Sequence, residues 1–109
     1  MKWVTHILWG VAALSLLHVD LYEAAAYSSL HTVVTDVLGH TGLRRNKIHD
    51  IVSLLVGVVI SVYLHNPAYM ALGLVHIILD LLAPGRLAVD MAYNILWSIP
   101  ASVIILYTL

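Results

Sequence analysis

The sequence predicts an all-α protein, an integral membrane helical bundle in which a single domain, residues 1–109, forms about five short transmembrane helices. Composition is the first reason: 61% of the residues are apolar and 10% are charged, against about 45–50% and about 25% in soluble domains. A soluble domain of this size still exposes roughly a third of its chain's surface, so it could not bury so many apolar residues. The second reason is that apolar runs, each close to the length of a spanning helix, recur between polar or proline-marked breaks.

We expect helices at about 3–18, 21–38, 48–65, 67–83 and 87–108. The first resembles a signal peptide in outline, but no A-x-A-like cleavage site precedes Asp20, so we interpret it as a retained helix. Segment 21–38 is rich in Ala, Ser and Thr, which is typical of a helix packed among other helices. Pro67 suits the first turn of the fourth helix, and the Pro-Gly pair at 84–85 ends that helix.

Five spanning helices place every Lys and Arg at one face of the membrane. These cations are Lys2, Arg44, Arg45, Lys47 and Arg86, whereas the connections near 20–23 and 65–67 contain none. Because cytoplasmic connections are enriched in Lys and Arg, the N-terminus is predicted to be cytoplasmic and the C-terminus outside. If 21–38 did not span the membrane, this asymmetry would weaken.

The same topology brings histidine or aspartate from all five helices to the cytoplasmic level. Asp36 with His40, and His76 with Asp80, are four residues apart, so each pair shares one helical face. Imidazole and carboxylate ligands suit a divalent ion such as Zn, Mn, Fe, Co or Ni, and the absence of cysteine excludes thiolate ligands and disulfides. The residues that converge are His6, Asp36, His40, His49, Asp50, His76, Asp80 and Asp90.

Structural roles compete with this interpretation. His49 and Asp50 can cap the third helix, and Asp80 or Asp90 can balance Arg86. His18 and His65 fall at helix ends on the far face, and His31, near mid-depth, can be a satisfied buried histidine or a proton relay. Ionisable groups inside membrane bundles are costly and usually functional, so the convergence as a whole favours a site.

Four segments then suggest a family: "TH" at 5–6, "D…GH" at 36–40, "LRRNKIHD" at 43–50 and "HIILDLLAPG" at 76–85. Their order resembles the membrane-bound, metal-dependent hydrolases, inner-membrane-associated proteins with short archaeal and viral relatives. The resemblance implies a hydrolase of a phosphoester or lipid at the cytoplasmic face. Ile48 and Asp50 stand where that family has Thr and Ser, and Ala83 replaces a threonine. The positions that match its polar residues are His6, Asp36, His40, His49, His76 and Asp80.

The leading hypothesis is therefore that these six residues bind one or two divalent ions, with Asp50 as general base. Arg44 and Arg45 would hold a phosphate. Alternatively, they orient the chain in the membrane and bind anionic lipid headgroups. Two alternatives stay open: a proton or metal-ion transport or channel protein, and a structural membrane protein, such as one of a virus envelope, with a stabilising metal.

Expected partners are membrane lipid and a lipid or phosphoester substrate. Small residues at Gly57, Ser61, Ala71 and Gly73 permit close helix packing or a homo-oligomer. Nucleic acid is not expected, because the net charge is −1 and the basic cluster is short and adjoins a membrane face.

Overall fold

The computed structural model describes residues 3–39, 47–83, 87 and 89–109. Those residues form five α-helices and one short 3₁₀ helix, and no strand occurs among them. The predicted all-helical class and the number of helices are thus confirmed. The elements are α1 (Trp3–Leu16), α2 (Leu21–Gly39), α3 (Lys47–Leu64), η1 (Pro67–Tyr69), α4 (Met70–Leu82) and α5 (Met91–Thr108).

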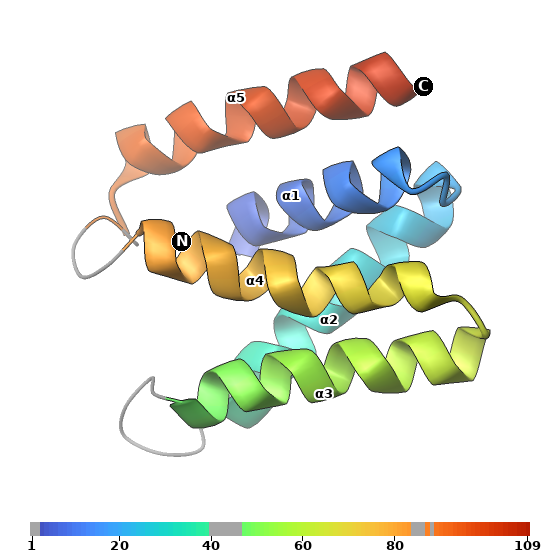
Figure 1. The fold of residues 1–109 in the computed structure, drawn as a ribbon. Coiled ribbons are helices and arrows are strands. Elements are labelled where there is room, and N and C mark those ends of the chain that lie inside the picture. Colours follow the sequence, from blue (N-terminus) through green and yellow to red (C-terminus); the bar gives the residue numbers. More distant parts are fainter. Residues whose placement is uncertain (1–2, 40–46, 84–86, 88) are drawn as a thin grey trace.

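Four of the helices lie in a row, in the order α5, α1, α4 and α3, and α2 crosses one side of that row (Figure 1). Helix α1 packs against α2, α4 and α5, whereas α3 packs against α2 and α4. Helices that follow one another in the chain run in opposite directions (Figure 1). The first residues of α1, α3 and α5 therefore share one end of the bundle with the last residues of α2 and α4. We call this the N-terminal end.

Side-chain caps fix where three helices begin. The side chains of Asp20 and Asn66 each accept a hydrogen bond from the backbone N–H two residues on, at 3.1 and 3.0 Å. Asp90 accepts one from the N–H of Tyr93 at 2.8 Å. Such a cap satisfies an N–H that has no partner within the helix. The last helix consequently begins at Met91, four residues after the expected start at 87, because extended Asp90 caps it.

Two histidines end helices at the opposite end of the bundle. His18 and His65 have positive φ angles of 66° and 53°. The N–H of the residue after each one returns to the carbonyl five residues earlier, at 2.9 and 3.0 Å. This is the Schellman arrangement, in which a left-handed residue closes the helix. It explains why α1 ends at Leu16, two residues before the expected end at 18.

Glycines allow two pairs of helices to approach closely. A Cβ atom at Gly10 would overlap Ser28 of α2, and one at Gly73 would lie 2.9 Å from the carbonyl oxygen of Ser53 in α3. Two serines form hydrogen bonds across these close contacts. Ser28 Oγ donates to Ile7 O at 2.9 Å, and Ser53 Oγ donates to Gly73 O at 3.1 Å. The α1–α2 and α3–α4 pairs are therefore joined by backbone-directed hydrogen bonds as well as by packing.

Apolar side chains are exposed on the outside of the bundle, and both polar and apolar residues are buried between its helices. Large aliphatic and aromatic side chains are exposed on all five helices, while ten polar or ionisable residues are buried between them. At the end opposite the N-terminal end, the interior is instead an apolar cluster that includes Leu14, Ile60, Tyr69 and Leu72. Among the described helices, Met91–Thr108 alone has both the length and the hydropathy of a membrane-crossing helix. Shorter apolar helices cover Trp3–Leu16, Asp50–Leu64 and Pro67–Leu82.

Candidate metal centre

Three helices bring histidine and aspartate together inside the N-terminal half of the bundle. His6 lies early in α1, Asp36 lies near the end of α2, and His76 and Asp80 lie in α4. Because His76 and Asp80 are four residues apart, they leave α4 on the same side. The antiparallel course of the helices places all four residues at a similar depth.

The nitrogen and oxygen atoms of this cluster converge on Asp80. Its Oδ1 lies 3.1 Å from His6 Nε2, and its Oδ2 lies 3.6 Å from His76 Nε2. His76 Nε2 is also 3.5 Å from Oδ1 of Asp36. The rings of His6 and His76 are stacked, with centroids 4.1 Å apart and an angle of 21° between their planes. The Nε2 atoms of both imidazoles thus face carboxylate oxygens: His6 faces Asp80, and His76 faces Asp36 and Asp80.

These separations are short enough for three side chains to share one divalent ion. One ligand atom each from His6, His76 and Asp80 lies within 4.8 Å of the other two. In a tetrahedral site with bonds of 2.0–2.1 Å, neighbouring ligand atoms are about 3.4 Å apart. The 3.1 Å and 3.6 Å distances at Asp80 involve its two different carboxylate oxygens, so they also suit hydrogen bonds between Asp80 and the imidazoles. Asp36 adjoins the group through His76, so it is suited to be a further ligand or to orient the imidazole.

The histidines and carboxylates of this cluster are largely shielded from water. His6 and His76 are buried, and the side chains of Asp80 and Asp36 are 8% and 18% exposed. Two carboxylates in an apolar bundle are costly unless they face a cation or hydrogen-bond donors. A divalent ion would neutralise both at once.

Neighbouring side chains hold the cluster in place. The indole Nε1 of Trp3 donates to Oδ2 of Asp36, which ties the start of α1 to the end of α2. Thr5 Oγ1 donates to Oδ1 of Asn94 at 3.0 Å, which joins α1 to α5. We did not predict Asn94 from the sequence. An amide in the apolar last helix is the signal that would have identified it, since polar groups in such helices usually have a partner.

His31 extends the buried polar groups towards the middle of the bundle. Its ring lies 5.7 Å from that of His76 at 64°, and its Nε2 lies 2.9 Å from the carbonyl oxygen of Ser53. The side chain is buried. This environment agrees with the interpretation as a satisfied buried histidine, whereas a role as a proton relay stays a prediction.

The remaining predicted residues are placed less fully. His40, Arg44 and Arg45 lie outside the described residues. His49 falls in the first turn of α3, where only the backbone is described, and Asp50 in the same turn is half-buried. The structure therefore brings together four of the six predicted metal ligands, His6, Asp36, His76 and Asp80. The role of Asp50 as general base and those of the arginines stay predictions.

Searches against family models, curated proteins and solved structures found no match to this chain. The resemblance to membrane-bound, metal-dependent hydrolases therefore stays a prediction, and the site is argued from its own geometry.

Proposed function

We propose that the chain is an integral membrane protein whose polar cluster lies at the cytoplasmic face. The support is the exposure of apolar side chains on every helix, since soluble monomers rarely expose such large apolar patches. The helices have 13 to 19 residues, so they are about 20–28 Å long. A hydrocarbon core is about 30 Å thick, so the bilayer around this protein thins locally.

Cysteine labelling tests this location, because the chain has no natural cysteine. Ile99 and Leu109 are both exposed, at 56% and 73%, but Ile99 lies mid-way along α5 and Leu109 ends the chain. In vesicles, a membrane-impermeant maleimide should label Leu109→Cys from the outside at least tenfold faster than Ile99→Cys. Equal rates in sealed vesicles would place α5 in water and refute the membrane location.

Within this bundle, we propose a divalent metal site formed by His6, His76 and Asp80, with Asp36 adjoining. The observation that carries it is the approach of the three ligand atoms to within 4.8 Å of one another. Imidazole and carboxylate ligands suit Zn, Mn, Fe, Co or Ni. The buried position of the two histidines would hold them near the geometry of ligation before any ion arrives.

The function that this site supports best is metal-dependent hydrolysis of a phosphoester or lipid. A bound ion would supply an activated water and would polarise a phosphoryl or acyl oxygen. Trp3 holds Asp36 by a hydrogen bond, and the stacked histidines keep their nitrogens on Asp80. Asp50 would accept a proton, and Arg44 and Arg45 would bind the anionic group of the substrate.

Metal content per chain is the first test. Purified protein should hold about one or two equivalents after reconstitution with zinc or manganese, and His6→Ala or His76→Ala should lose them. His65→Asn is the matched control: it removes a histidine at the far end, and asparagine also accepts the left-handed conformation. Equal metal in all four proteins would refute the site.

Turnover then separates an enzyme from a structural metal site. We expect hydrolysis within a panel of phosphoesters and lipids, and we expect that His76→Ala abolishes it while far-UV circular dichroism is unchanged. Metal that raises the melting temperature without any turnover would instead support the structural alternative. The apolar cluster beyond His31, which includes Leu14 and Leu72, weighs against transport through a single chain.

A further inference from the structure

Thr35 of α2, the residue before Asp36, carries a buried hydroxyl group. Its side chain is fully buried, and its Oγ1 has no hydrogen-bond partner within the described part of the chain. Other helical hydroxyls in the bundle behave differently, because Ser29, Ser98 and Ser102 each donate to the carbonyl oxygen four residues earlier, at 2.7–2.9 Å. Buried hydroxyls nearly always have a partner, and one that lacks a partner is destabilising. The Thr35 hydroxyl is therefore suited to a partner that does not belong to its own helix.

The geometry of α2 directs Thr35 towards the metal cluster. Both His31 and Asp36 reach His76 from this helix, with ring centroids 5.7 Å apart for His31 and 3.5 Å between Oδ1 of Asp36 and Nε2 of His76. At about 100° of rotation per residue, Thr35 is turned about 40° from His31 and about 100° from Asp36, so it lies between them on the helix surface. Because α2 and α4 run in the same direction (Figure 1), Thr35 is also level with Asp80, one turn beyond the contact between the two histidines.

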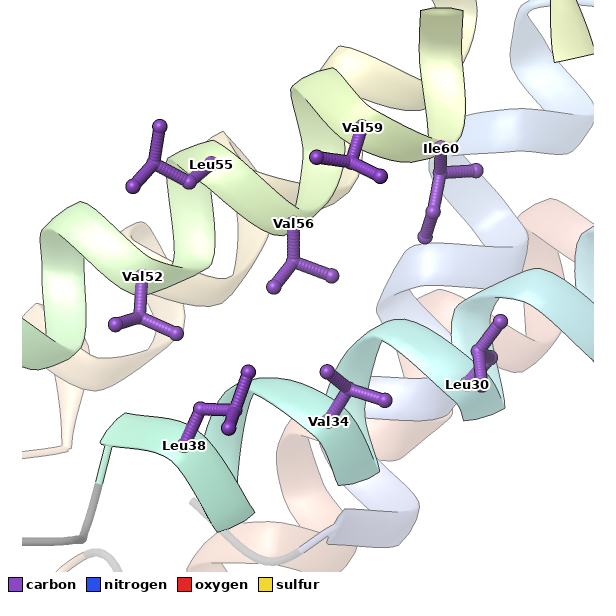
Figure 2. Close-up of a pocket in the computed structure, with 8 residues that line it drawn as sticks. All are labelled: Leu30, Val34, Leu38, Val52, Leu55, Val56, Val59 and Ile60. Atoms are coloured by element: carbon purple, nitrogen blue, oxygen red, sulfur yellow. The ribbon is translucent and has the colours of Figure 1, made fainter. Parts of the chain in front are cut away.

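The aliphatic face of α2 points elsewhere. Leu30, Val34 and Leu38 line a groove along the outer seam with α3. Figure 2 shows Val34 of α2 and Val56 of α3 pointing towards one another across this groove. Every residue that lines the groove is aliphatic, and Thr35 is not among them. The side chain of Thr35 therefore lies in the interior of the bundle and does not open to the outer seam.

We propose that Thr35 is a positioning residue of the metal site, whose hydroxyl forms a hydrogen bond with the water that completes the coordination of the ion. Catalytic zinc sites with three protein ligands keep a fourth position for water or substrate. His6, His76 and Asp80 provide three such ligand atoms. A threonine hydroxyl can donate to that water and accept from it, so it fixes how the water is oriented. The inference rests on the metal site proposed above and adds a residue that holds the water without ligating the ion.

Zinc affinity of the full-length protein in detergent, measured by competition with a chromophoric chelator, tests the proposal. Thr35→Val keeps the shape of the side chain and removes the hydroxyl, so it should weaken zinc binding about 10- to 100-fold, the usual effect of losing a group that supports a metal site. Thr35→Ser keeps the hydroxyl and should bind zinc like the wild type. Ser61→Ala is the matched control and should leave the affinity unchanged. Ser61 Oγ is also buried without a hydrogen-bond partner among the described residues, but it lies near the other end of α3.

Two further measurements separate positioning from a structural role. In the presence of EDTA, Thr35→Val should melt at the same temperature as the wild type or higher, because it removes a buried hydroxyl that has no protein partner. After zinc is added, its melting temperature should rise less than that of the wild type, because weaker binding stabilises less. With cobalt in place of zinc, the visible absorption bands depend on the ligands of the ion. They should change in Thr35→Val and stay unchanged in Thr35→Ser.

Several results would overturn the proposal. They are wild-type zinc affinity and cobalt bands in Thr35→Val, an equal loss of affinity in Ser61→Ala, or a lower melting temperature of Thr35→Val in EDTA, which would assign the hydroxyl to the fold itself. If Thr35→Val does not fold, Thr35→Ala replaces it, because alanine and serine at this position differ only in the hydroxyl. A wild type that binds no zinc would refute the metal site itself. Zinc that is lost in His76→Ala and fully kept in Thr35→Val would refute this inference alone.

Discussion

The contact between α3 and α4 provides a sharp test of the packing, with two glycines as a matched pair. A Cβ atom at Gly73 would lie 2.9 Å from the carbonyl oxygen of Ser53 and 3.1 Å from the Cα atom of Leu54. Both are backbone atoms, so α3 itself would have to move. A Cβ atom at Gly57 would have its nearest neighbours at 3.4 Å, which is ordinary contact.

The expected magnitudes follow from these distances. Replacing glycine by alanine in a helix interior is favourable by about 1 kcal/mol through propensity alone. Gly57→Ala should therefore leave the free energy of unfolding unchanged or raise it by up to about 1 kcal/mol. Overpacking a tight contact costs about 1–3 kcal/mol, so Gly73→Ala should lower stability by up to about 2 kcal/mol net. It should also strain the hydrogen bond from Ser53 to Gly73 O.

The measurement is reversible unfolding in detergent micelles, followed by far-UV circular dichroism and by the fluorescence of the three tryptophans. Gly57→Ala is the internal control for helix propensity, because it lies in the same interface. If Gly73→Ala is as stable as Gly57→Ala, the close approach of α3 and α4 is wrong. A loss confined to Gly57→Ala would contradict the reasoning still more directly.

Three further predictions concern the helix ends and the metal. His18→Gly and His65→Gly should each raise the free energy of unfolding by about 1 kcal/mol, because both residues have positive φ; equal or lower stability in the same micelle assay would contradict this. Asp90→Ala should cost about 1 kcal/mol by removing the cap of α5, and Asp90→Asn should restore most of it. Zinc affinity, titrated downward from pH 8, should be weakest at the most acidic pH, because protons compete with the metal for imidazole and carboxylate ligands; an affinity that rises as the pH falls would argue against these ligands.

The sequence predicted the helices well because apolar runs and their breaks are local features. Proline, glycine and capping residues mark most of the ends. The start of α5 was misplaced because the apolar residues at 87–89 extend the run, whereas the structure begins the helix after Asp90, whose side chain caps it. The early end of α1 was missed for a related reason, since histidine is an uncommon residue for a left-handed cap.

The topology predicted which residues share one level of the bundle, but not which of their side chains face one another. Alternating helix directions put His6, Asp36 and His76 at one level, and the four-residue spacing put Asp80 beside His76. Sequence alone could not show that Asp80 faces both histidines, because this depends on how α1 and α4 are rotated about their axes. The partnership of Asn94 with Thr5 depends in the same way on the packing of α5 against α1.

The edge position of α5 has a consequence for the metal site. Helix α5 lies at one end of the row and packs against α1 (Figure 1). The described residues of the metal cluster belong to α1, α2 and α4 instead. Helix α5 can therefore move away from α1 without taking a described ligand with it, and such a movement would loosen the support of His6 through the contact between Thr5 and Asn94.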